Sequence, residues 1–290
     1  MSIIQIIKNT HDHQETITKS VYQTNYGEHT LLVISHPECC AAISLQGAHL
    51  LYWHPKQSSR PIIWLSEKTI FKKGTAIRGG IPVCWPWFGK VAEPAHGFAR
   101  IVDWQLTSCT ENEHGVDILL SLKDNERTRR YWPHSFELEL KLHLGKTCQL
   151  ELAYQGDFNA TGALHSYFGI SDISAITVSG LGDTYEERLT TRNEPKIVGQ
   201  MTFDQAVDRI YTHPASISLI KDKDHTIKIT HHNHSDVVTW TPWDGAKNVI
   251  DLDDESYHHF VCVETSRINK PIASNSKQKT RYGVTIEVVK

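Results

Sequence analysis

The sequence contains little that would tie the protein to a membrane or to a polyanion. No apolar run approaches the roughly 18 residues that a membrane-spanning helix requires. Residues 1–8 lack the continuous apolar stretch of a signal peptide. Thirty Lys and Arg against 33 Asp and Glu give a net charge of −3, so no overall basic field attracts nucleic acid. We therefore expect a cytoplasmic protein with no nucleic-acid and no membrane partner.

The sequence also lacks the common cysteine, metal and nucleotide motifs. Six scattered cysteines without a Cys-x-x-Cys pair or a secretory signal predict reduced thiols. No Walker, dinucleotide or Gly-x-Ser-x-Gly motif is present, which removes support for nucleotide use and acyl transfer. The histidine clusters at 11–13, 231–234 and 258–259 do not match His-Glu-x-x-His. We interpret them as mainly solvated surface, and we expect no metal and no cofactor.

Alternation of apolar and polar residues predicts the fold class. Period-2 alternation is typical of half-buried strands, and it occurs at 42–45, 116–119, 136–144, 149–153, 227–229 and 284–288. Helical periodicity is scarce, and its best candidate, 123–132, ends at Pro133. Strands without intervening helices favour antiparallel sheets. We expect a mainly β protein, a large antiparallel β-sandwich with few short helices, forming one domain over residues 1–290.

Arginine and tryptophan gather in segments that interrupt the strand pattern. The stretch 71–89 is dense in Gly, Pro and aromatic residues and contains Arg78, and Arg100 follows shortly after. Two guanidinium groups can hold a phosphate bidentately, although arginines beside a glycine bend also form surface ion pairs. Trp85 and Trp87 suit either stacking on a sugar ring or core packing. The residues by themselves leave both alternatives open.

His165 and Glu264 are the candidate proton-transfer residues. His165 lies in an aromatic-rich stretch, where an imidazole can exchange protons near neutral pH. A single histidine is nevertheless more often structural. Glu264 ends an apolar run, 260–263, that is typical of a buried strand, and a carboxylate there must be paired, hydrogen-bonded or shifted in pKa. Such groups cluster at active sites, although structural ion pairs produce the same pattern.

Eight short motifs, in order along nearly the whole chain, resemble the aldose 1-epimerase (galactose mutarotase-like) superfamily, specifically its hexose-6-phosphate mutarotase branch. They are LQGAH (45–49), WLS (64–66), IRGGIPVCWPWFG (77–89), HGFAR (96–100), LHSYF (164–168), VDRIY (207–211), WTPW (240–243) and VCVE (261–264). The resemblance implies a large antiparallel β-sandwich and an isomerase that interconverts the α and β anomers of a hexose 6-phosphate, that is, a glucose-6-phosphate 1-epimerase. A small-molecule sugar phosphate would be its partner, and we expect a monomer.

The same resemblance assigns roles to individual residues. His165 would be the general acid and Glu264 the general base of sugar ring opening, with a charged histidine beside a charged carboxylate, which their mutual attraction would favour. The substrate-binding residues implied are Arg78 and Arg100 for the phosphate, Asp208 for sugar hydroxyls, and His96. The tryptophans expected to line the sugar site are Trp85, Trp87, Trp240 and Trp243.

Three other functions are compatible with parts of this pattern. An aldose 1-epimerase acting on unphosphorylated sugars would need the same acid and base but not the arginines. A non-catalytic carbohydrate-binding module would keep the pocket, although it would have no use for both proton-transfer residues. A glycosidase requires two carboxylates flanking the bond, and Glu264 with Asp208 would be the candidates. The resemblance instead implies a histidine–glutamate pair.

Overall fold

The computed structural model describes residues 5, 15–189 and 199–289, and its strands form three antiparallel sheets. The five-stranded sheet has the order β1 (Glu15–Thr16), β2 (Val21–Tyr26), β3 (His29–Ser35), β4 (Cys39–Ser44) and β5 (His49–Pro55). The nine-stranded sheet has the order β15 (Gln200–Met201), β13 (Thr177–Ser179), β17 (Ile217–Lys221), β18 (Thr226–His232), β21 (Thr280–Val289), β10 (Cys148–Gln155), β9 (Glu137–Gly145), β8 (Gly115–Lys123) and β7 (Gln105–Asn112). The third sheet has the order β14 (Tyr185–Glu187), β16 (Val207–Tyr211), β19 (Asp236–Thr241), β20 (Phe260–Ser274), β11 (Phe158–Leu164) and β6 (Val83–Cys84), and β12 (Tyr167–Gly169) pairs with β20.

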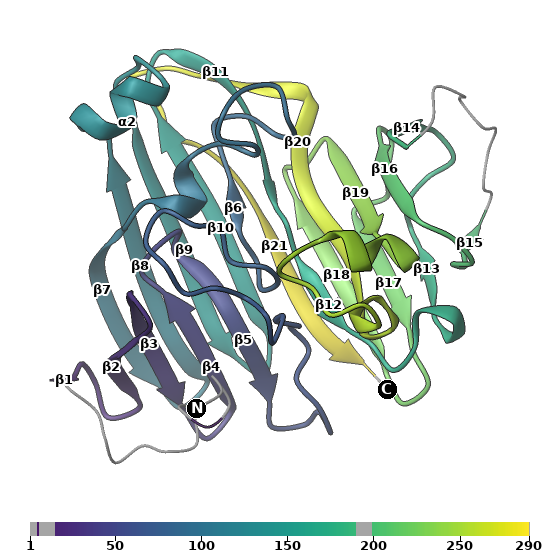
Figure 1. Ribbon diagram of the computed structural model, residues 1–290. Coiled ribbons are helices and arrows are strands. Elements are labelled where there is room, and N and C mark those ends of the chain that lie inside the picture. The colour runs from purple at the N-terminus through teal and green to yellow at the C-terminus, as the bar shows by residue number, and fades with distance from the viewer. Residues whose placement is uncertain (1–4, 6–14, 190–198, 290) are drawn as a thin grey trace.

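The nine-stranded sheet extends across the molecule from β7 to β15 (Figure 1). A single main core cluster takes buried side chains from all three sheets, for example Ile43 of β4, Leu140 of β9 and Val263 of β20. The sheets are therefore packed through one shared apolar interior, as the sandwich prediction requires. Each of the six stretches predicted from alternation lies in or overlaps a strand, so the mainly β prediction is confirmed.

Strand β9 shows why the alternation forms this structure. Leu138, Leu140, Leu142 and Leu144 are fully buried, while the polar residues between them face outward. Successive side chains of a strand point to opposite faces, so one face of β9 is continuously apolar. Burying each of these leucines stabilises the fold by about 1.5–3 kcal/mol relative to leaving it exposed.

Helical structure is confined to short segments in the described part of the chain. The α-helix is α2 (Glu126–Tyr131), and the 3-10 segments are η1 (Ala99–Ile101), η2 (Ile173–Ala175), η3 (Trp243–Asn248) and η4 (Ser256–His259). Asn125 begins α2 by accepting a hydrogen bond from the Thr128 backbone N–H at 3.1 Å. The helix ends before Pro133, because proline disfavours helical geometry in the residue that precedes it. Among the described residues, no helix has both the length and the apolarity to span a membrane.

The histidine cluster at 231–234 is only partly at the surface. His231 is 3% exposed, with Nδ1 2.7 Å from the Thr265 hydroxyl and Nε2 3.0 Å from the Ser218 hydroxyl. His232, its neighbour in β18, is exposed, because adjacent strand residues face opposite sides. The interpretation of this cluster as solvated surface is therefore wrong for His231, which is a hydrogen-bonded core residue. The histidines at 11 and 13 lie outside the described residues.

Burial lowers the pKa of His231 to about 3, and this predicts acid sensitivity of the fold. Below the ordinary histidine pKa of about 6.5, the unfolded chain binds a proton that the folded chain excludes. Stability is therefore lost as pH falls from about 6.5 toward 3, by up to about 1.4 kcal/mol per pH unit for this group. In urea unfolding, the deficit of His231→Gln relative to wild type should shrink between about pH 7.5 and about pH 5.5. The exposed-site variant His232→Gln is the control, and a His231→Gln deficit that does not change with pH would contradict the prediction.

Candidate active site

Strand β20 separates the core from a second, chemically different surface. Val261 and Val263 belong to the main core, whereas Phe260 and Cys262 belong to a separate cluster on the other face of the strand. Residues two apart share a face, so Glu264 lies on the same side as Cys262. The apolar run that predicted a buried strand thus places its terminal carboxylate on the face away from the main core.

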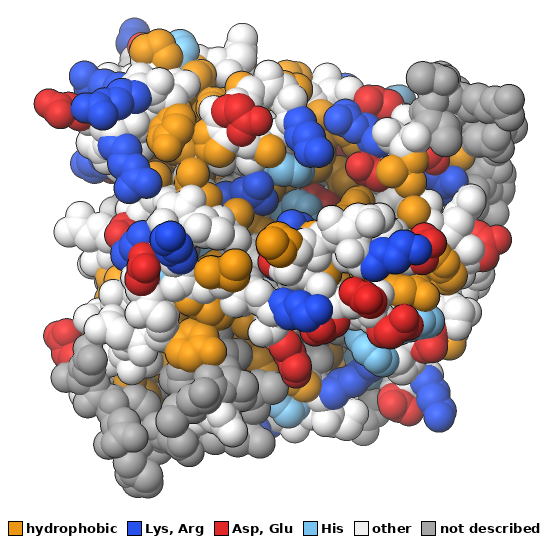
Figure 2. Space-filling model, in the orientation of Figure 1, with side chains coloured by type: hydrophobic (Ala, Val, Ile, Leu, Met, Phe, Trp, Pro, Cys, Tyr) orange, Lys and Arg blue, Asp and Glu red, His pale blue; other side chains and the backbone are white. Residues whose placement is uncertain are grey.

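Cross-strand register brings further polar residues to that face. Cys262 pairs with Tyr167 of β12 on one side and with Trp240 of β19 on the other, and Trp240 pairs in turn with Asp208 of β16. Directly paired residues project on the same side of a sheet. His165 lies in the short link between β11 and β12. The space-filling view in Figure 2 shows a hollow on the molecular surface where histidine, basic and acidic side chains gather.

His165 and Glu264 come into contact in this buried surface. The Nδ1 atom of His165 lies 3.2 Å from Oε1 of Glu264, within ion-pair distance but without hydrogen-bond alignment. The residues are 7% and 1% exposed. The imidazole stacks on the Tyr167 ring, with centroids 4.9 Å apart and planes 8° from parallel. No described residue hydrogen-bonds to Oε2 of Glu264. The structure therefore holds an acid–base pair with a free carboxyl oxygen.

The electrostatics of the pair differ from the sequence-based expectation of two charges. Burial raises the pKa of Glu264 well above its usual value, and the nearby Asp208 carboxylate adds to the shift, while Arg100 opposes it. Burial lowers the pKa of His165, and the positive charges of Arg100 and Arg78 lower it further. Desolvation favours the uncharged form of both groups. Both pKa shifts therefore oppose the charged histidine–carboxylate pair that the resemblance implies.

Arg78 is fixed beside this pair by two hydrogen bonds. Its Nε donates to Oδ1 of Asp251 at 3.0 Å, and its Nη1 donates to the Tyr167 hydroxyl at 3.2 Å. The following residue, Gly79, has φ +100°, and a Cβ there would stand 2.6 Å from the Leu65 Cα. Only glycine fits this close backbone approach. Gly79 therefore allows the segment that carries Arg78 to pack directly against the backbone at Leu65.

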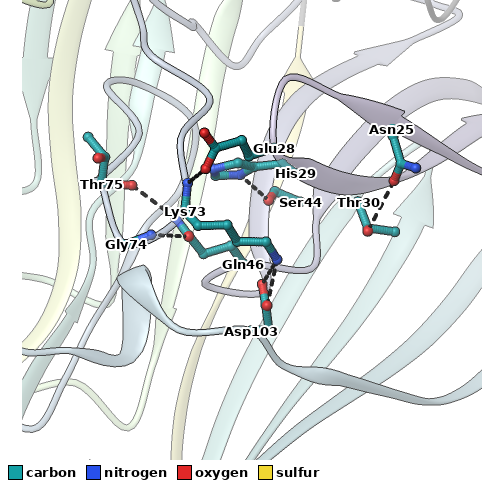
Figure 3. A network of polar contacts seen from close by, with 10 residues as sticks. All are labelled: Asn25, Glu28, His29, Thr30, Ser44, Gln46, Lys73, Gly74, Thr75 and Asp103. Carbon is teal, nitrogen blue, oxygen red and sulfur yellow. Dashed lines mark hydrogen bonds and ion pairs between the residues drawn. The ribbon is translucent and has the colours of Figure 1, made fainter. Parts of the chain in front are cut away.

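Gln46 holds the loop that leads into the Arg78 segment (Figure 3). Its Oε1 accepts from the Gly74 N–H at 2.8 Å, and its Nε2 donates to the Thr75 carbonyl at 2.9 Å. In the same network, Nζ of Lys73 pairs with the Asp103 carboxylate at 2.6 Å. Lys73 is thus engaged in an ion pair with Asp103. Gln46 of the 45–49 motif therefore has a structural role, because its two hydrogen bonds hold the loop that leads to Arg78.

Arg100 and His96 lie close to the pair on another segment. Nη2 of Arg100 donates to the Ala95 carbonyl at 2.7 Å, and its buried Nε has no hydrogen-bond acceptor in the described part of the chain. The His96 and His165 ring centroids are 5.7 Å apart. Burial, together with Arg100 and Arg78, lowers the pKa of His96 to about 3. His96 has φ +62°, a left-handed conformation that is uncommon outside glycine and that concentrates at functional sites.

The tryptophans divide between core and site. Trp85 and Trp87 are 1% and 9% exposed and belong to the main core, where Trp85 packs edge-on against Phe98. The expectation that these two line a sugar site is therefore wrong, and the core alternative holds. Trp240 is different, because it is half-buried and meets the His165 ring edge-on with centroids 6.3 Å apart. Trp240 is thus a wall of the site.

Cys262 completes a cluster that has the composition of a metal site. Ligand atoms of Cys262, His165 and Glu264 lie within 4.8 Å of one another. Metal binding would require the thiolate, whereas burial raises the pKa of the Cys262 thiol well above its usual value. Arg78 and Arg100 add positive charge nearby, which opposes a cation. The donor set therefore does not fit a resident metal ion.

Three residues of this site were not found from the sequence. Tyr167 lies inside the LHSYF motif, but neither the motif nor its neighbours predict a role for it. Cys262 was detectable, because it is two residues before Glu264 on a predicted strand. The contact of Asp251 with Arg78 could not be predicted from the sequence, since Asp251 lies in an ordinary acidic stretch 173 residues from Arg78. Asp208 and Glu264, both implied by the resemblance, lie on the same face of this sheet.

An antiparallel sandwich of this topology, with its polar site on one sheet, places the protein in the class with the galactose mutarotase-like fold. The solved structure of a Salmonella typhimurium protein described as a "putative mutarotase" superposes with a TM-score of 0.96 at 39% identity and covers 100% of both chains. The model of the aldose 1-epimerase family matches residues 30–287. The chain belongs to the aldose 1-epimerase family, and it is an isomerase.

Curated relatives agree with this assignment over nearly the full length. A Salmonella typhimurium protein is 40% identical over 283 residues, which is 95% of this chain and 96% of its own. An Escherichia coli K12 protein is 39% identical over the same length and coverage. Both carry the name "Putative glucose-6-phosphate 1-epimerase".

Proposed function

We propose that the protein interconverts the α and β anomers of glucose 6-phosphate by opening and reclosing the sugar ring. The observation that carries this proposal is the buried contact of His165 Nδ1 with Glu264 Oε1 at 3.2 Å, next to two arginines. An acid–base pair beside guanidinium groups suits a sugar that carries an anionic group. The names of the curated relatives support the same substrate.

Ring opening requires one proton to leave the sugar and one to enter it. Glu264 takes the proton of the C1 hydroxyl while protonated His165 gives a proton to the ring oxygen, so that the bond from C1 to the ring oxygen breaks and an aldehyde forms. Rotation about the C1–C2 bond exposes the other aldehyde face. Closure then reverses both transfers, as His165 takes the C5 hydroxyl proton and Glu264 protonates the aldehyde oxygen. The enzyme returns to its starting proton count.

The resting electrostatics are compatible with this cycle. A protonated Glu264 beside a neutral His165 and an ionised Glu264 beside a protonated His165 contain the same single proton. A rotation that aligns Nδ1 of His165 with Oε1 of Glu264, 3.2 Å apart, lets that proton move between the residues and produces the reactive form without exchange with solvent. The sugar supplies hydroxyls to the charged pair when it enters, and hydrogen bonds to a charged form favour that form.

The arginines and Asp208 provide the remaining contacts in the proposal. Arg78 retains donors on Nη1 and Nη2 beyond its bonds to Asp251 and Tyr167, since a guanidinium carries five N–H groups. Arg100 retains guanidinium N–H groups beyond its Nη2 bond to the Ala95 carbonyl. These donors suit the oxygens of a phosphate. Asp208 is half-buried on the same face, where its carboxylate suits sugar hydroxyls.

Anomer exchange measured by NMR tests the function directly. Magnetisation exchange between the α and β C1 signals of glucose 6-phosphate should be accelerated by catalytic amounts of purified protein, well beyond the buffer blank. Glucose measured under the same conditions should be accelerated less, because it lacks the group that the arginines bind. Absence of any acceleration for glucose 6-phosphate would refute the proposal, and equal acceleration of glucose would favour an aldose 1-epimerase.

A further inference from the structure

Tyr167 connects the two halves of the site. Its hydroxyl accepts a hydrogen bond from Nη1 of Arg78 at 3.2 Å, while its ring lies flat against the imidazole of His165. We propose that Tyr167 is a positioning residue that couples phosphate binding at Arg78 to proton transfer by His165. The phosphate of the substrate then activates the acid–base pair in addition to anchoring the sugar. This inference rests on the function proposed above.

The ring of Tyr167 is held tightly enough to transmit a small displacement. It is 2% exposed and is packed between His165 and a wall of aromatic rings, with the Phe260 centroid 5.4 Å away and the Trp240 centroid 6.0 Å away. Densely packed interiors transmit strain because they contain little empty volume. The tyrosine ring therefore cannot shift without moving the imidazole stacked on it.

The Arg78 end of this connection is the part that a ligand can reach. Its side chain is 29% exposed, and its two described side-chain partners are Asp251 and Tyr167. A phosphate dianion that bonds to the outer guanidinium nitrogens would fix the plane of the group and with it the donor to Tyr167. The dianion would also offset a positive charge that faces His165. Both effects favour the geometry and the protonated imidazole that ring opening needs.

Binding energy from a remote part of a substrate can be used to raise the rate of the chemical step. If the phosphate acts in this way, it need not be attached to the sugar. Phosphite dianion added to glucose should accelerate the enzyme-catalysed anomer exchange of glucose by about tenfold at saturation. If the phosphate only anchors the sugar, free phosphite should leave the rate of glucose anomer exchange unchanged, because phosphite that is not bonded to the sugar cannot hold the sugar in the site.

The experiment measures glucose exchange by NMR, with and without phosphite, for the wild type and for Tyr167→Phe. Phosphite itself promotes anomer exchange as a weak base, so a protein-free blank at each concentration is subtracted. Tyr167→Phe should lose the activation while its phosphite affinity, measured by calorimetry, stays within about threefold of wild type. With glucose 6-phosphate, the variant should lose kcat by about tenfold at a nearly constant KM.

Tyr282→Phe is the matched control. Tyr282 is 1% exposed, and its hydroxyl has no hydrogen-bond partner among the described residues. Both substitutions thus remove one buried hydroxyl, but only Tyr167 links Arg78 to His165. Tyr282→Phe should keep the phosphite activation. A loss of activation in both variants would attribute the effect to general loosening of the core and would overturn the proposal.

Other outcomes separate the coupling from the function itself. Activation that persists in Tyr167→Phe, or a wild type that converts glucose 6-phosphate rapidly but ignores phosphite, overturns the coupling and leaves the function intact. No acceleration with glucose 6-phosphate overturns the function. If Tyr167→Phe does not fold, Arg78→Lys replaces it, because lysine keeps the charge but lacks the rigid fork. Activation retained in Arg78→Lys would then overturn the coupling.

Discussion

Glu264→Gln is expected to lower kcat for glucose 6-phosphate anomerisation by about 10²- to 10⁴-fold, the usual contribution of a positioned general acid or base. Glutamine has nearly the same shape but cannot accept the C1 hydroxyl proton. It also removes the proton that the carboxyl group shares with His165, at a contact of 3.2 Å. Exchange NMR at saturating substrate measures the loss.

Binding measurements distinguish a loss of rate in the chemical step from a loss of affinity for the substrate. Arg78 and Arg100, the proposed phosphate-binding residues, are unchanged in Glu264→Gln, so the affinity for glucose 6-phosphate in calorimetry should remain close to that of wild type. Glu151→Gln, at an exposed glutamate paired with Arg281, is the control and should retain full activity. A Glu264→Gln enzyme with normal kcat would remove Glu264 from the mechanism.

Arg78→Ala should lower kcat/KM for glucose 6-phosphate by about 10- to 100-fold through lost binding, since hydrogen bonds to charged groups contribute about 1.5–3 kcal/mol. The proposed coupling through Tyr167 adds a further loss in kcat. The ratio of kcat/KM values for glucose 6-phosphate and glucose should fall accordingly. Competition of the two sugars in one exchange experiment gives this ratio directly.

A matched arginine substitution controls for the loss of positive charge. Arg281→Ala removes a cation on the exposed pair with Glu151 and should leave the preference for glucose 6-phosphate unchanged. An Arg78→Ala enzyme that still prefers the phosphorylated sugar to the wild-type extent would place the phosphate elsewhere, with Arg100 as the next candidate.

The regular part of the fold was predictable because its signal is local. Alternation along β9 and β10 follows directly from a sheet with one buried face, and the structure confirms it. Two-residue strands such as β6 are too short to produce a period, so their pairing depends on distant partners. His231 was misjudged for a related reason, since its cluster was interpreted by composition instead of by the alternating faces of β18.

The site was predictable where a motif contained it and not where the fold assembled it. His165 and Glu264 each lie in a recognised motif, and the structure places them in contact. The pKa directions depend on burial and on charges from several segments, so a sequence that names both residues still leaves their resting charges open. The Arg78–Asp251 bond joins residues 173 positions apart and becomes visible only after folding.

The two-faced strand β20 constrains how this enzyme can evolve. Val261 and Val263 are required by the core, and they fix which side Glu264 occupies. A one-residue insertion before Glu264 would turn the carboxylate toward the core. The insertion would therefore prevent folding, and the loss of activity would follow from the loss of the fold. Selection for folding therefore preserves the acid–base geometry without acting on catalysis. New substrate preferences are expected to arise in the loops around Arg78 and Asp251, where sequence can drift independently of this strand.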